Sequence, residues 1–100
     1  MSMDRMAYQV IRGYADPRAA HDLYGRVLTR IVFSAWKWLQ EERGQRKDPP
    51  PFHYCRFAEK LALKYAREDL KAIGRWKCSY RKLPPHELLQ KAVELTSLAV

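Results

Sequence analysis

Residues 52–74 read FHYCRFAEKLALKYAREDLKAIG, and this stretch has the periodicity of a long amphipathic helix. Its apolar side chains recur at steps of three and four residues, which places them on one helical face. They are Tyr54, Ala58, Leu61, Ala62, Tyr65, Ala66, Leu70 and Ile73. Gly74 supplies a natural helix stop. We therefore predict a helix over residues 52–73 that packs this face against neighbouring helices.

Proline and glycine also mark the ends of the preceding helix. Asp16 can cap free backbone N–H groups, and Pro17 has the φ angle of a first helical position. With Gly44 as its stop, this helix covers residues 17–43. Its most apolar part, residues 31–39, is typical of a bundle centre or an interface. Gly25, inside the helix, leaves room for close packing of the N-terminal segment.

The rest of the chain adds a linker and two further helices. Residues 45–51 contain three successive prolines, which cannot lie inside a helix. The apolar spacing predicts a last helix over 85–98 and a short helix near residues 4–13. No segment alternates with period two for long enough to predict a strand. The predicted fold is all-α: a single helical domain, residues 1–100, with three main helices (17–43, 52–73 and 85–98) and a short N-terminal one.

Composition bounds the class of protein. With 47% hydrophobic residues in a chain of 100, the sequence is too apolar for a disordered tail. Two cysteines are too few for a disulfide-stapled secreted domain, and the first residues lack the apolar core of a signal peptide. The apolar stretch 31–39 is about half the length that spans a bilayer. We expect a cytoplasmic protein with free thiols and no membrane association.

Positive charge is concentrated on the predicted helix 52–73. Six cations are separated by steps of four, four, three, four and four residues, which places all of them on one face. This basic stripe consists of Arg56, Lys60, Lys64, Arg67, Lys71 and Arg75. It is about 28 Å long at the rise of an α-helix. Residues 56–82 carry nine Lys and Arg against three Asp and Glu, which is most of the net charge of +8.

A basic and aromatic loop follows the stripe. It interleaves cations with two aromatic rings and contains Arg75, Trp76, Lys77, Tyr80, Arg81 and Lys82. Cations neutralise phosphates and release counterions, and aromatic rings stack on unpaired bases. Together the stripe and the loop predict a nucleic-acid-binding surface that contacts the phosphate backbone of DNA or RNA. A solvated helix face has the same charge pattern, and Trp76 and Tyr80 also suit a role in closing the core.

Two tryptophans indicate a second kind of contact. Trp36 and Trp38 lie two residues apart, so they cannot both face one core. We expect Trp38 and Leu39 to be buried and Trp36 to be exposed as a protein-interface anchor.

The sequence gives little support for a catalytic site or a metal site. His53, Cys55, Cys78 and His86 are able to bind zinc, but their spacing matches no usual zinc motif. The carboxylate pairs Glu41–Glu42 and Glu68–Asp69 are adjacent in sequence, so we expect them to diverge into solvent. We predict a protein that is not an enzyme and that holds no metal or cofactor.

The first functional hypothesis is a non-catalytic nucleic-acid-binding module that serves as an accessory subunit of a larger nucleoprotein complex. In size, helicity and charge the chain resembles the small helical subunits of CRISPR effector complexes. That resemblance rests on shape and charge and assigns no residue a role. The alternative is a protein-interaction module, an adapter or a phage-encoded inhibitor, that docks its basic face on an acidic partner.

Overall fold

The chain packs its helices around one central helix. The computed structural model describes residues 3–46 and 55–98, and every regular element in these two ranges is helical. The elements are α1 (Met3–Ile11), α2 (Pro17–Ser34), α3 (Trp36–Arg46), α4 (Arg56–Ala72), the short 3-10 helix η1 (Cys78–Lys82) and α5 (Pro85–Leu98). The all-α prediction is confirmed, with five α-helices in the described ranges rather than four. None of the described helices is long and apolar enough to cross a bilayer.

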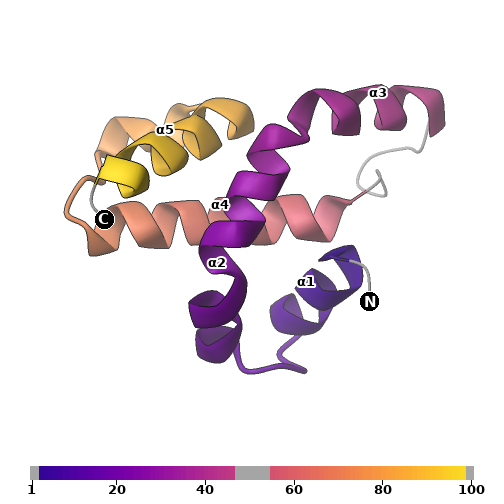
Figure 1. Cartoon of the computed structure of the whole chain (residues 1–100), viewed down its shortest axis with the longest axis horizontal. Helices are drawn as coiled ribbons and strands as arrows, with labels where there is room; N and C mark the ends of the chain where they lie inside the picture. Colours follow the sequence, from indigo (N-terminus) through magenta and orange to yellow (C-terminus); the bar gives the residue numbers. More distant parts are fainter. Residues whose placement is uncertain (1–2, 47–54, 99–100) are drawn as a thin grey trace.

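α4 occupies the centre of the fold, and α1, α2 and α5 each pack against it (Figure 1). α2 crosses α4 steeply, so that the two helices form the middle of the molecule (Figure 1). The predicted apolar face of α4 is buried, with Leu61, Tyr65 and Leu70 among the largest fully buried side chains. Small alanines at 58, 62 and 66 are also buried and let the neighbouring helices approach closely.

Both ends of α4 have identifiable capping groups. At the start, Cys55 adopts a left-handed conformation and makes no side-chain cap. The carboxylate of Asp4, on α1, instead accepts hydrogen bonds from the backbone N–H groups of Phe57 and Ala58, at 2.9 and 3.0 Å. At the other end, Gly74 has a φ of +71°, and the N–H of Arg75 donates to the carbonyl of Leu70 at 2.8 Å. This is a Schellman motif, and it confirms Gly74 as the helix stop.

The predicted helix 17–43 is wrong in two respects. It breaks at Ala35 into α2 and α3, and α3 runs through Gly44 to Arg46. No proline or glycine marks the break. We attribute it to two contacts that α3 makes with distant elements: the Trp36 ring stacks on His86 of α5, and Arg43 forms an ion pair with Glu59 of α4. Gly44 does not end a helix, because its backbone keeps a negative φ and lies inside α3.

The remaining expectations about helix bounds are met only in part. The bounds of the last helix, 85–98, are confirmed. The short N-terminal helix is present and ends at Ile11. The predicted linker, 45–51, overlaps the end of α3 at Gln45 and Arg46. Its other residues, and residues 52–54 of the second predicted helix, lie outside the described ranges.

The apolar stretch 31–39 does not lie at the bundle centre. Only Val32 and Leu39 within it are fully buried, whereas Ile31 is 40% exposed. The two tryptophans are the reverse of the expectation: Trp38 is 51% exposed, and Trp36 packs against the core. Along α2, the buried side includes Leu28 and Val32, and the other apolar side, with Ile31, stays uncovered.

Candidate nucleic-acid interface

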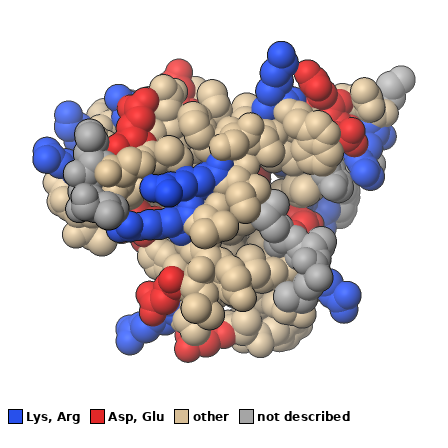
Figure 2. Space-filling model, in the orientation of Figure 1, with Lys and Arg blue, Asp and Glu red and all other residues tan. Residues whose placement is uncertain are grey.

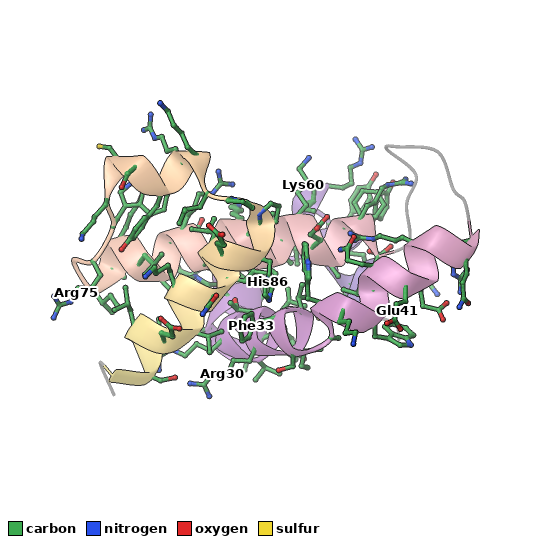
Figure 3. All side chains as sticks on the ribbon, turned by 90° about the horizontal axis from the view of Figure 1, so that it is seen from above. Arg30, Phe33, Glu41, Lys60, Arg75 and His86 are labelled. Carbon is green, nitrogen blue, oxygen red and sulfur yellow. The ribbon has the colours of Figure 1, made fainter. Side chains whose placement is uncertain are left out.

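The basic stripe lies on the side of α4 that none of the other described helices covers. Lys60, Lys64, Arg67 and Lys71 are all exposed, and Arg75 is exposed just beyond the Gly74 turn. Figure 3 shows Lys60 pointing away from the side of α4 where Phe33 and Arg30 of α2 lie. The sequence periodicity therefore predicted the common direction of these cations correctly, because α1, α2 and α5 occupy the other sides of the helix.

The carboxylates of α4 are turned away from the stripe. Glu59 accepts two hydrogen bonds from the guanidinium of Arg43, on α3, at 3.3 and 3.4 Å. Glu68 and Asp69 both contact His21, on α2, at 3.4 and 2.7 Å. Within the described residues, Lys60, Lys64 and Arg67 form no ion pair, so their charge is not neutralised by the acids of their own helix.

The contacts of Glu68 and Asp69 with His21 correct one expectation. Glu68 and Asp69 do not diverge into solvent but converge on the same imidazole. Asp69 keeps only 15% of its side chain exposed. The His21 ring also stacks on Tyr65, with 4.5 Å between the ring centroids. These contacts tie α2 to the side of α4 opposite the stripe.

Arg56 differs from the other members of the stripe. Its side chain is half-buried, and its guanidinium lies over the ring of Phe57, 4.5 Å from the centroid. Delocalised guanidinium groups stack well on aromatic faces. Arg56 therefore adds positive charge at the start of the stripe from a fixed position.

A cleft of about 330 Å³ runs along one edge of the stripe. Lys60, Lys64 and Arg67 line one wall, and Val10, Ile11 and Gly13 at the end of α1 line the other. Sequence reasoning missed this cleft, because no local signal shows that α1 docks beside the stripe. The cations therefore border a hollow with an apolar wall rather than a smooth helix surface.

The loop after α4 places its cations and its rings differently. Lys77, Arg81 and Lys82 are exposed, as a phosphate contact requires. Trp76 and Tyr80 are half-buried against the core and meet edge to face, 5.9 Å between centroids. The ammonium of Lys71 lies 5.3 Å from the Trp76 ring. Beside the rings is a hollow of about 210 Å³, which Arg75 and Lys77 also line. The rings thus close the core and keep one side open toward the cations.

The candidate zinc ligands are not brought together within the described ranges. His86 stacks on the rings of Phe33 and Trp36, with 5.1 and 5.7 Å between the ring centroids. Cys78 is exposed and Cys55 is half-buried, and His53 lies outside the described residues. Among residues 3–46 and 55–98, no three His, Cys, Asp or Glu side chains form a group suited to a metal ion.

Comparisons with protein-family models, with curated proteins and with solved structures found no match to this chain.

Proposed function

We propose that the chain binds nucleic acid through the phosphate backbone, as a non-catalytic module of a larger nucleoprotein assembly. The observation that carries the proposal is the separation of charge on α4. Its three carboxylates contact α2 and α3, whereas four of its cations face outward without ion pairs among the described residues: Lys60, Lys64, Arg67 and Lys71. A surface evolved only for solubility gains from interspersed charges of both signs.

The stripe suits a polyanion for physical reasons. Like charges three and four residues apart on a helix repel one another, so each pair of cations destabilises the isolated helix by a few tenths of a kcal/mol. A bound phosphate backbone removes that repulsion and releases its own counterions. Because α4 is buried on its other sides, the cations project from a rigid element and keep their spacing.

The loop extends the same surface. Arg75, Lys77, Arg81 and Lys82 continue the positive charge beyond Gly74. The hollow beside Trp76 and Tyr80 is the place where an unpaired base next to a bound phosphate would meet an aromatic ring. The phosphate contacts supply most of the affinity, and these rings favour a single strand over a duplex.

The test is a salt titration of binding to a fluorescently labelled single strand and to a duplex. Five phosphate contacts predict a slope of log K against log salt of about −3.5 to −4.5. The variant carrying Lys60→Glu, Lys64→Glu and Arg67→Glu should bind at least about tenfold more weakly at low salt and give a shallower slope. The helical circular dichroism should stay unchanged, because these three side chains are exposed.

A control variant makes the same change in net charge elsewhere. It carries Arg18→Glu, Lys37→Glu and Lys91→Glu, three exposed positions outside the stripe and the loop. Its affinity should fall much less than that of the stripe variant. Equal losses would show that total charge, and not the stripe, attracts the nucleic acid. A wild-type chain that fails to bind at low salt would refute the proposal and favour an acidic protein as the partner of the stripe.

A further inference from the structure

The face of α2 that points away from α4 is apolar and uncovered. Leu23, Tyr24, Val27 and Ile31 are 69, 46, 55 and 40% exposed, and their spacing places them on one side of the helix. Figure 2 shows mostly uncharged surface where α2 crosses the front of the molecule, with basic side chains beside it. A contiguous apolar patch of this kind on a small domain marks a contact site.

We propose that this face of α2 binds the same face of a second copy, in an antiparallel, two-fold symmetric dimer centred on Val27. This inference does not depend on the proposed function. Two features of α2 select a second copy as the occupant: the order of its apolar residues, and the charges beside them.

The apolar residues are self-complementary under this symmetry. A two-fold axis at Val27 brings each residue opposite the one equally far on the other side of the axis. Val27 then meets Val27 of the second copy, and Leu23, four residues before the axis, meets Ile31, four residues after it. Apolar side chains therefore meet apolar side chains at the centre of the contact.

The charges beside the apolar face are also complementary. A hollow of about 380 Å³ borders it, lined by Leu23, Arg26 and Val27 together with the carboxylate-bearing Asp22 and Asp69. Because residue 30 comes opposite residue 24, Arg30 of the second copy comes beside the middle of this hollow, on the same edge of the helix pair. In the single chain its guanidinium donates to the exposed hydroxyl of Ser97 at 3.2 Å, and in the dimer it would turn from Ser97 to the hollow. Asp22 forms no ion pair within the described residues and is open to that guanidinium.

The high net charge does not oppose this dimer strongly. The basic stripe lies on the opposite side of α4, and the molecule is 21 Å across its shortest axis, along which α2 lies in front (Figure 1). The two stripes therefore point away from each other across both copies. That separation is several times the Debye length of about 8 Å at physiological salt.

Sedimentation velocity tests the dimer, and a cysteine at the axis tests its geometry. The wild-type chain should pass from monomer to dimer with rising concentration, and Val27→Glu and Ile31→Glu should each raise the dissociation constant at least about tenfold. Both positions are exposed in the single chain, so the variants should fold normally by circular dichroism. Lys37→Glu, an exposed change on α3, is the matched control and should leave the constant unaltered.

In a chain whose two native cysteines are replaced by serine, Val27→Cys should form an intermolecular disulfide under mild oxidation. Ala19→Cys should not, because its two copies lie about 24 Å apart along the helix pair. A chain that stays monomeric up to about 200 µM overturns the proposal and leaves the face to a different protein. Cross-linking that is no faster at 27 than at 19 also overturns it, since the dimer would then use another surface.

Discussion

Gly25 is the residue whose replacement says most about how α2 is held on α4. A Cβ at this position would overlap the Cδ2 of His21, one turn earlier on the same helix. That ring cannot move freely, because it is stacked on Tyr65 and bonded to Asp69. The close contact that the sequence suggested at Gly25 is thus made by His21 and not by the N-terminal segment.

We therefore expect Gly25→Ala to destabilise the protein, although alanine is the better helix former. The helix-propensity gain is about 1 kcal/mol, and displacing a packed ring costs about 1–3 kcal/mol, so the net loss should be about 1 kcal/mol. Gly44→Ala is the control, because Gly44 lies inside α3 with open space around it. It should gain up to about 1 kcal/mol. Urea unfolding at low protein concentration measures both, and a stabilised Gly25→Ala variant would contradict the role given to His21.

Tyr65 carries a buried hydroxyl without a hydrogen-bond partner in the described part of the chain. Burial, and then the charge of Glu68, raise the pKa of Tyr65 above its ordinary value near 10. In the folded state the phenol holds its proton at a pH where the unfolded chain loses it. Stability from this residue is therefore complete below about pH 10 and falls as the pH rises further.

Replacing Tyr65 by phenylalanine should remove that dependence. At pH 7 the variant should be as stable as the wild type or up to about 1 kcal/mol more stable, since no hydrogen bond is lost. Above about pH 10 its advantage should widen, because phenylalanine does not ionise. Urea unfolding at pH 7 and at alkaline pH gives the comparison. A variant destabilised at pH 7 by more than about 1 kcal/mol would show that the hydroxyl has a partner after all.

At the scale of single elements, the sequence predicted those helices whose signals are local. The bounds of α5 and the end of α4 follow from periodicity and from one glycine, and the structure has both. The break at Ala35 could not be predicted, because its causes are His86 and Glu59, which are far away in the sequence. The same limit explains the tryptophans of α3: Trp36 packs inward where its ring stacks on His86 of α5, and no local signal in the sequence shows that contact.

The start of α4 is another feature that local reasoning cannot find. Its cap comes from Asp4, more than fifty residues earlier, whose carboxylate accepts from two orphan N–H groups of the first turn. A carboxylate here also interacts favourably with the helix dipole. The candidate cleft beside the stripe depends on the same docking of α1, which is why it was missed together with the cap.

Asp4→Ala should cost about 1 kcal/mol of stability, the usual loss for a missing helix cap. Asp4→Asn should retain most of it, because an amide oxygen can accept the same two hydrogen bonds. Glu41→Ala, an exposed change on α3, should shift stability by less than about 0.5 kcal/mol. Thermal or urea unfolding of the three variants ranks them. If Asp4→Ala and Glu41→Ala were equally mild, the carboxylate would not be the cap of α4 in solution.

At the scale of the whole molecule, α4 separates two surfaces of opposite character. Its outward side carries the basic stripe, and the helix packed on its other side carries the uncovered apolar face (Figures 1 and 3). The positive charge is concentrated on one side of α4, and the common direction of Lys60, Lys64, Arg67 and Lys71 could be predicted from the sequence because these residues share one helix. The apolar face needed the structure, because its residues share a helix with core residues of the same type.

If both proposals hold, the dimer carries its two stripes on opposite outer sides and joins two nucleic-acid segments. Two strands with different fluorophores should then show energy transfer once the protein concentration exceeds the dissociation constant of the dimer. Val27→Glu should abolish the transfer while each strand still binds with the wild-type salt slope, because position 27 and the stripe lie on opposite sides of α4 and act additively. The stripe variant should lose binding and transfer together, and its dimer constant should change by less than about twofold. Transfer that survives Val27→Glu would mean that one chain holds both strands, and the α2 face would then have no part in bringing them together.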